Sequence, residues 1–401
     1  MKSSWRRRLL GIAFGCFLSF LILEAGVRCI EPKRVLRSYF ETPDRVLHHK
    51  FIPGAQGHYR SLEYSTSYDI NSLGLRDREL PQKKPAGMRR ILVLGDSFTE
   101  GIGVEAAQSI PSRLQARVDG DGLGKEWQVV NGGVASYSPL LEYLYLKNGG
   151  LELEPDLVVL MFDLSDVWDD FQYTALARFD AQGKPLAVDA DPEPPKKSWP
   201  VEALISVKDF IKEHVRLYNF MRRSIGRIIE SRRTHMYSGD VRTDKYAMLR
   251  DGYQPTDERD WELTHKYILM IRDLLKERGI DFLLTVYPYG LQVSPREWSE
   301  GRVFWGFEKN RVYATKPQDK LAEFAKKNGI RVLDMSEDFK QAAHTKYPLY
   351  LDIDGHMQAA GCDLAASILH RFLVPELKRP KASERTEMHT SAPAVEADKP
   401  R

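Results

Sequence analysis

Short runs of apolar residues recur along the chain from residue 91 onward. They occupy residues 91–94, 129–130, 157–162 and 282–287. None of them alternates with polar residues, as a half-exposed strand would. Each run therefore predicts a strand that is buried on both faces of a parallel sheet. Amphipathic helical patterns lie between the runs, at residues 109–118 and 261–278.

Two later segments, LLKERGIDFLLTVYP and AEFAKKNGIRVLDMS, share one layout. In each, a helical pattern ends at a glycine (Gly279 or Gly329), and an isoleucine and an apolar run follow. Glycine after a helical pattern is a common helix stop, so each segment predicts a helix followed directly by a strand. Repeated units of this kind favour an α/β fold, a doubly wound, flavodoxin-like parallel sheet with helices on both faces.

The N-terminus has the pattern of a membrane anchor. Lys2 and Arg6 to Arg8 precede an uncharged stretch at residues 9–23, and residues 25–27 continue the helix beyond Glu24. Together these residues are long enough to cross a bilayer, and the basic cluster predicts a cytoplasmic N-terminus. A cleaved signal peptide is the competing interpretation, but Leu23-Glu24-Ala25 makes a poor cleavage site.

These patterns divide the chain into four parts. We expect a signal anchor or transmembrane helix at residues 1–30, a membrane-proximal segment at 31–88, an α/β domain at 89–376 and a disordered polar tail at 377–401. An insertion at about residues 171–260 interrupts the α/β domain. It begins with a predicted hairpin around Gly183 and continues with a proline-rich loop, and its length is typical of a lid or binding wall.

Charge argues against nucleic acid as a partner. The chain has 59 basic and 56 acidic residues, a net charge of +3, and no basic stripe with interleaved aromatic residues.

The first candidate for chemistry is Ser97, in the sequence Gly95-Asp96-Ser97 directly after the first apolar run. At the carboxyl edge of a parallel sheet, this serine would stand where ligands bind. The amides after it, near a helix start, could stabilise a developing oxyanion. The alternative is that Asp96 or Ser97 only caps a helix.

A nucleophilic serine needs a base, and His356 is the best candidate among 10 histidines. It lies in LYLDIDGHMQAAG, two residues after Asp354, which could orient the imidazole as in a Ser-His-Asp triad. Asp352, Asp354 and His356 could instead hold a metal, although the spacing of a Ca²⁺ loop is absent. A capped helix without chemistry is the remaining alternative.

Together, GDSFTEG at residues 95–101 and DGH followed by Gln358-Ala-Ala-Gly361 resemble the SGNH or GDSL hydrolase family. The similarity extends over about residues 91–373, apart from the insertion. DINSLGLRDRE at residues 69–79 and the Asp-x-His spacing resemble membrane-anchored bacterial members that act in polysaccharide O-acetylation. The resemblance implies an SGNH-hydrolase-like fold with Ser97, His356 and Asp354 as catalytic residues.

The resemblance also implies an oxyanion hole, and here the sequence departs from the family pattern. The backbone amides of Ser97 and Ser136 would contribute, with Gly133 as a second candidate for the latter position. Ser165 stands where the family has asparagine, and its hydroxyl can donate one hydrogen bond. The neighbouring Asp163 would orient Ser165, or would form a solvent-facing acidic lip with Asp166, Asp169 and Asp170.

The implied function is that of a serine ester hydrolase or O-acyltransferase. Its substrate would be an acylated cell-envelope glycan or a lipid-linked ester, with no metal or organic cofactor. The domain would lie on the extracytoplasmic side of the inner membrane, with a membrane acyltransferase as a partner. A catalytically silent glycan-binding or assembly module is the alternative.

Two further features have competing interpretations. Arg76 is expected in a surface salt bridge rather than near the site. The aromatic residues Trp298, Phe304, Trp305 and Phe307 are expected to pack in the core, with stacking on sugar rings or lining of an acyl pocket as the alternatives.

Overall fold

The computed structural model describes residues 2–30, 40–61, 63–190, 199–218, 220–221, 244–251, 253 and 258–378. At its centre is a five-stranded parallel sheet with the order β11-β10-β7-β5-β6. Numbered along the chain, this is the 2-1-3-4-5 order of flavodoxin-like folds, as predicted. The strands are β5 (Arg89–Gly95), β6 (Trp127–Asn131), β7 (Leu157–Phe162), β10 (Asp281–Val286) and β11 (Arg331–Asp334).

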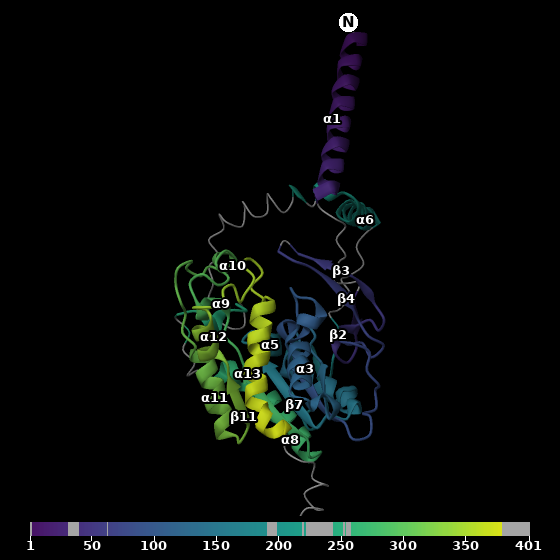
Figure 1. Cartoon of the computed structure of the whole chain (residues 1–401). Helices are drawn as coiled ribbons and strands as arrows, with labels where there is room; N and C mark the ends of the chain where they lie inside the picture. The colour runs from purple at the N-terminus through teal and green to yellow at the C-terminus, as the bar shows by residue number, and fades with distance from the viewer. Residues whose placement is uncertain are drawn as a thin grey trace, which may run out of the picture.

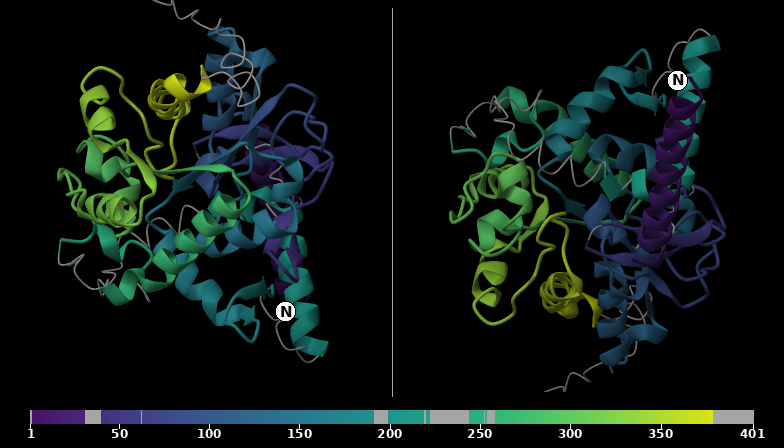
Figure 2. Two further views of the ribbon diagram at one scale, coloured as in Figure 1. Left: turned by 90° about the horizontal axis from the view of Figure 1, so that it is seen from below. Right: turned by 90° about the horizontal axis from the view of Figure 1, so that it is seen from above.

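Helices cover both faces of this sheet (Figures 1 and 2). On one face α3 packs against α13, and on the other α4, α5 and α8 pack together. α11 lies beside α8, as the stacking of Phe324 of α11 on His265 of α8 shows. The helices are α3 (Ile110–Gly120), α4 (Pro139–Asn148), α5 (Asp166–Leu176), α8 (Glu258–Glu277), α11 (Lys316–Lys327) and α13 (Ala359–Leu377).

This arrangement follows from right-handed crossovers. The chain moves from β5 to the edge strand β6, and then in the opposite direction through β7, β10 and β11. The direction reverses between β5 and β7, and ligands of such sheets bind beyond the carboxyl ends of the strands at this point. Short helices follow the carboxyl ends of several strands. They are α2 (Ser97–Glu100), α9 (Gly290–Val293), α10 (Gly301–Phe304) and α12 (Ser336–Ala342).

The apolar runs of the sequence correspond to strands. All residues of β7 are buried, as are six of the seven residues of β5, as expected for central strands that are covered on both faces. Gly279 and Gly329 follow α8 and α11 with φ of 67° and 66°, a left-handed conformation that ends each helix at little cost.

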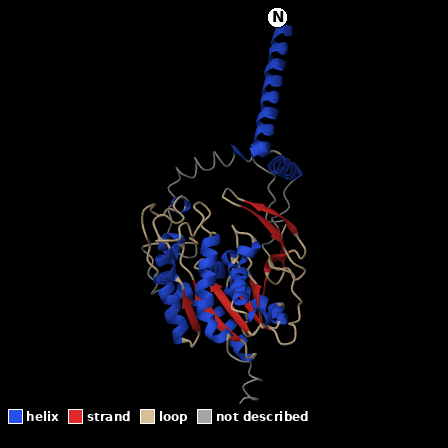
Figure 3. Cartoon of the chain, in the orientation of Figure 1, coloured by secondary structure: helices blue, strands red, loops and turns tan. Residues whose placement is uncertain are grey.

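The N-terminal helix α1 (Lys2–Ile30) projects from the globular part of the molecule (Figures 1 and 3). Within it, Arg7–Cys29 is long and apolar enough to cross a membrane, and 6% of its most apolar stretch is buried. A signal sequence has the same length and composition, so this helix is a candidate membrane span.

The membrane-proximal segment packs onto the α/β domain through two antiparallel hairpins. Its buried side chains belong to the same hydrophobic core. Arg76 is 1% exposed and donates to the carbonyl oxygens of Ser67, Gly101 and Val104, so the predicted surface salt bridge is wrong. The strands are β1 (Glu41–Asp44), β2 (His48–Phe51), β3 (Gln56–Arg60) and β4 (Ser65–Asp69).

The insertion begins as predicted, with a hairpin of β8 (Ala177–Phe179) and β9 (Pro185–Val188) around Gly183, whose φ is 76°. Helix α6 (Trp199–His214) follows. Most of the predicted proline-rich loop, at residues 191–198, lies outside the described residues. So does the predicted disordered tail after Lys378.

Candidate active site

The turn after β5 presents Ser97 at the carboxyl edge of the sheet. Gly95 has a φ of 153°, and a Cβ at this position would lie 2.1 Å from Thr99 Oγ1. Only glycine therefore permits this exit from the strand. The Asp96 carboxylate caps α2 by accepting the Phe98 amide hydrogen at 2.9 Å, and Ser97 is the first helical residue. Capping thus belongs to Asp96, whose second carboxylate oxygen accepts from Ser97 Oγ at 3.0 Å.

The loop after Tyr350 brings His356 to Ser97. The distance between His356 Nε2 and Ser97 Oγ is 2.7 Å, and His356 Nδ1 contacts Asp354 Oδ1 on the other side of the ring. With the proton on Nδ1, the imidazole donates to Asp354 and accepts from the serine hydroxyl. Phe98 packs against the imidazole, with 4.8 Å between ring centroids. Among the three residues expected from the sequence, His356 therefore contacts both Ser97 and Asp354.

Electrostatics favour the charged forms of this His–Asp pair. Burial alone would raise the pKa of Asp354, but the charge of His356 and hydrogen bonds from His356 and Tyr64 hold it below its ordinary value. Burial would lower the pKa of His356, but the Asp354 charge and hydrogen bond raise it above its ordinary value. A basic imidazole next to the serine hydroxyl can serve as a proton acceptor once it is deprotonated.

Glu63, from the membrane-proximal segment, holds the loop that carries Asp354. Its two carboxylate oxygens accept the amide hydrogens of Ile353 at 2.9 Å and Asp354 at 2.6 Å. Trp298 Nε1 donates to the Ile353 carbonyl at 3.1 Å from the opposite side. Asp352, in contrast, accepts from Ser299 and has no role in orienting His356. Sequence analysis missed Glu63, because nothing in SLEYS distinguishes it from a surface glutamate.

We expect Glu63→Ala to lower kcat/KM for ester hydrolysis by about 10- to 100-fold, mostly through kcat. The reason is that losing both charge-assisted hydrogen bonds lets the loop of Asp354 and His356 shift away from Ser97. Glu63→Gln keeps one acceptor oxygen and should fall in between. Steady-state kinetics and the rate of fluorophosphonate labelling measure the effect.

Glu79→Ala is the matched control for this prediction. Glu79 also accepts a backbone amide and a hydroxyl hydrogen, both from Ser72, but on the exposed side of the same segment. Its loss should leave kcat unchanged. An unchanged labelling rate in folded Glu63→Ala would show that Glu63 does not position the site.

The backbone amides of Ser97 and Ser136 have no acceptor among the described residues. Ser136 has a φ of 62°, a conformation that side chains seldom adopt, so its amide is held in a strained turn. Gly133 does not offer its amide, which donates to Asn131 Oδ1 at 3.0 Å. A Cβ on Gly133 would lie 2.3 Å from the Glu100 nitrogen, so this glycine permits close packing against α2 instead.

Ser165 lies at the start of α5, after the carboxyl end of β7. Its Oγ donates to Asp169 at 3.4 Å, and its amide donates to Asp163 Oδ1 at 2.7 Å. Asp163 also accepts from the hydroxyls of Tyr287 and Tyr289. Asp163 therefore orients the backbone of Ser165, one of the two interpretations left open by the sequence.

The other interpretation, a solvent-facing acidic lip, is wrong. Five carboxyl groups form a buried acidic cluster, each at most 4% exposed: Asp96, Asp163, Asp166, Asp169 and Asp170. Burial and the Asp163 charge raise the pKa of Asp96 to about 7, and burial raises that of Asp169 to about 8. The tyrosines after β10 and the start of α8 cover these groups, which the local sequence cannot reveal.

Lys245 is a second residue that sequence analysis missed. Burial would lower its pKa, but the neighbouring Tyr246 and the charges of Asp169, Asp163 and Asp96 raise it above the ordinary value. The cation reduces the charge repulsion within the acidic cluster. Only the tertiary structure reveals its role, because Lys245 belongs to the insertion, far from Ser97 and His356 in sequence.

An aromatic wall adjoins the loop of His356. The Tyr246 ring contacts those of Tyr289, Trp298, Trp305 and Phe307, with centroid distances of 4.7 to 6.4 Å. Trp298 and Phe307 are buried, as the core interpretation predicts, whereas Trp305 is 39% exposed. Trp305 thus keeps a surface on which a substrate can stack.

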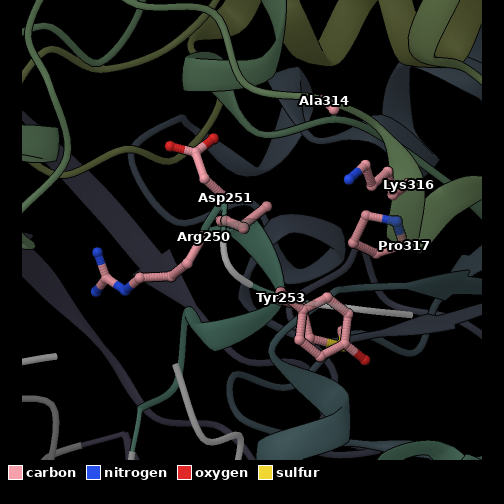
Figure 4. A pocket seen from close by; sticks show the side chains of 8 residues that line it. Arg250, Asp251, Tyr253, Ala314, Lys316 and Pro317 are labelled. Atoms are coloured by element: carbon pink, nitrogen blue, oxygen red, sulfur yellow. The ribbon is translucent and has the colours of Figure 1, made fainter. Parts of the chain in front are cut away.

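A small pocket lies at the start of α11 (Figure 4). None of the three residues Ser97, Asp354 and His356 lines it, so it is distinct from the candidate active site. It is lined by Met248, Leu249, Arg250, Asp251, Tyr253, Ala314, Lys316 and Pro317.

Comparisons with known proteins agree with the motifs. Residues 248–399 match the family model "SGNH hydrolase-like domain, acetyltransferase AlgX". This range includes Asp354 and His356 but not Ser97. The resemblance to SGNH hydrolases is therefore confirmed, and the chain has an SGNH hydrolase-like fold. The acetyltransferase of the matched model fits the O-acetylation type that the Asp-x-His spacing predicts.

Two esterases and a putative lipolytic protein are among the solved structures that the chain matches, all at low sequence identity. An acetyl xylan esterase, AlAXEase, is 12% identical, with a TM-score of 0.38 over 71% of this chain and 99% of that chain. A two-domain esterase active on acetylated mannans is 11% identical, with a TM-score of 0.37 over 74% and 52%. A putative lipolytic protein of the G-D-S-L family from Desulfitobacterium hafniense DCB-2 is 14% identical, with a TM-score of 0.35 over 70% and 98%. No curated protein sequence matches the chain.

Proposed function

We propose that the chain is a serine esterase or O-acyltransferase that acts through an acyl-Ser97 intermediate. The observation that carries the proposal is the contact of Ser97 Oγ with His356 Nε2 at 2.7 Å, while Asp354 contacts the other ring nitrogen. Such a chain of contacts lets an imidazole take the hydroxyl proton as the oxygen attacks a carbonyl.

The proposed reaction has two halves. Ser97 Oγ attacks the ester carbonyl carbon, its proton passes to His356 Nε2, and the carbonyl oxygen becomes an oxyanion. His356 then gives this proton to the leaving alcohol oxygen as the bond to that oxygen breaks, which leaves acyl-Ser97. In the second half His356 deprotonates water or a sugar hydroxyl, whose oxygen attacks the acyl carbon. The bond from the acyl carbon to Ser97 Oγ then breaks, and His356 returns the proton to this oxygen.

The amides of Ser97 and Ser136 are the proposed oxyanion donors, and the Ser165 hydroxyl is the third. Because Ser165 already donates to Asp169 at 3.4 Å, it would have to exchange this long contact for one to the oxyanion. A donor that forms its best bond only with the developing charge lowers the barrier rather than the ground state.

We propose an acylated cell-envelope glycan or lipid-linked ester as the substrate. The acetyltransferase named in the matched family model supports acetyl as the acyl group and a sugar hydroxyl as the acceptor. The exposed Trp305 and its aromatic neighbours are suited to stacking on a sugar ring. The proposed location is the outer face of the inner membrane, with α1 as the anchor and the basic residues before it in the cytoplasm.

The experiment that tests this function follows acyl-enzyme formation and its fate. The full-length protein in detergent is treated with a fluorophosphonate probe and, separately, with 4-nitrophenyl acetate with and without an oligosaccharide acceptor. A single adduct together with acetate release indicates an esterase, and acetylated oligosaccharide indicates a transferase. Absence of any adduct on folded protein would favour the silent glycan-binding module.

A further inference from the structure

Helix α6 of the insertion exposes large apolar side chains to the surroundings. Trp199 is 80% exposed, Leu204 75%, Val207 58% and Phe210 60%. At the angular spacing of a helix, these four residues lie within an arc of roughly 140°. Soluble proteins seldom leave such a contiguous apolar face in water, so the face has a partner.

The residues just after α6 are hydrogen-bonded to α1, near the end of α1 that lies closer to the globular part (Figure 1). Glu24 accepts the amide hydrogens of Arg216 at 3.0 Å and Leu217 at 2.8 Å. It also accepts a hydrogen bond from Arg28 Nε at 2.8 Å. The Arg216 guanidinium donates to the Arg28 carbonyl at 3.2 Å. Glu24 is the only acidic residue of α1. Its carboxylate is 10% exposed. The one negative charge of α1 that opposes membrane insertion is therefore paired and hydrogen-bonded here.

We propose that α6 lies in the surface of the lipid bilayer, beside the membrane anchor, with the face formed by Trp199, Leu204, Val207 and Phe210 in contact with lipid. The inference rests on the proposed role of α1 as an anchor, and it does not depend on the chemistry of Ser97. Lipid is favoured over a protein partner because the chain after α6 is joined to α1 at Glu24, directly after the exposed apolar residues Leu21, Ile22 and Leu23.

The polar groups around this face fit the same surface. Arg28 and Arg216 lie at the junction, where guanidinium groups can reach lipid phosphates, and Lys208 is exposed on α6 itself. Tryptophan at one end of the helix is typical of side chains at the membrane–water interface.

This placement has a consequence for the candidate active site. In Figure 3 the strands point toward the side of the domain on which α1 and α6 lie, and the active-site residues follow the carboxyl ends of these strands. With α1 and α6 both at the bilayer, the site faces the membrane, where a lipid-linked ester would present its acyl group.

The test measures where Trp199 lies in the full-length protein, reconstituted into vesicles of phosphatidylethanolamine and phosphatidylglycerol. The fluorescence of Trp199 is the difference between wild type and Trp199→Phe. It is quenched with phospholipids brominated near the glycerol or near the chain end, and with aqueous iodide. We expect strong quenching by the shallow bromines, weaker quenching by the deep ones and protection from iodide.

A variant with Leu204→Ser, Val207→Ser and Phe210→Ser removes the apolar face. Because these side chains are exposed, the fold should persist, and the ratio of bromine to iodide quenching of Trp199 should fall by about tenfold or more. Val312→Ser is the control, since it removes an exposed apolar side chain far from α6 in the chain. It should leave the ratio unchanged.

Trp5 reports separately on the anchor, through the difference between wild type and Trp5→Phe. If Trp5 is quenched by bromolipids while Trp199 is quenched by iodide, the proposal that α1 is a membrane anchor is supported and the inference on α6 is wrong. If neither tryptophan is quenched by bromolipids, the proposed anchor fails as well. If Trp199 is protected from both iodide and bromolipids, its partner is a protein, and the lipid proposal is overturned.

Discussion

Replacing Ser97 with alanine is expected to abolish covalent labelling by a fluorophosphonate and to lower kcat for ester hydrolysis by about 10⁴-fold or more. The reason is that Ser97 Oγ is the atom in contact with His356 Nε2, so no other oxygen in the site can take its place as nucleophile. Intact mass after labelling and steady-state kinetics measure both effects.

The control is Ser72→Ala, an exposed serine of the membrane-proximal segment. It should be labelled at Ser97 and turn over at the wild-type rate. Labelling that persists in Ser97→Ala would mean that a different side chain is the activated nucleophile. The assignment of Asp354 and His356 would then lose its basis.

The second large effect is expected for Asp354→Asn. Loss of the carboxylate removes the group that orients the imidazole and stabilises its positive charge, and kcat should fall by about 10⁴-fold. The pH profile should also change. Since the Asp354 charge raises the pKa of His356, the wild-type rate should rise with pH through a value above 6.5, the ordinary pKa of histidine.

The sign of the change in Asp354→Asn follows from the same cause. Without the Asp354 charge, burial dominates and lowers the pKa of His356, so the acid limb of kcat/KM should move to lower pH. Residual activity across a pH series measures this shift. Asp352→Asn is the matched control, because Asp352 contacts Ser299 and not His356. It should leave the acid limb in place, and an equal shift in both variants would contradict the assignment.

The insertion connects several features that are far apart in sequence. The residues just after α6 contact α1 through Glu24, and Lys245 and Tyr246 lie by the acidic cluster and in the aromatic wall.

Local patterns in the sequence were sufficient for the elements of the fold. Residues 157–162 form β7 without any shift in boundaries, because an apolar run of this length between turn residues is satisfied only in a covered strand. Gly279 and Gly329 mark the helix ends, because a left-handed residue is a local requirement. The pairing of Ser97 with Asp354 and His356 was also predicted, because a nucleophilic serine needs a base and because the two motifs resemble those of SGNH hydrolases.

Only the tertiary structure decided which polar groups are buried and what they contact. One of the two interpretations of the sequence placed Asp163 and Asp169 on an exposed acidic surface, but tyrosines from the end of β10 and Lys245 from the insertion lie beside them. Glu63, which holds the loop of Asp354, has no local signal because its partners are backbone amides almost three hundred residues away. Burial and long-range contacts depend on the whole packed chain, whereas strands, caps and motifs depend on neighbouring residues.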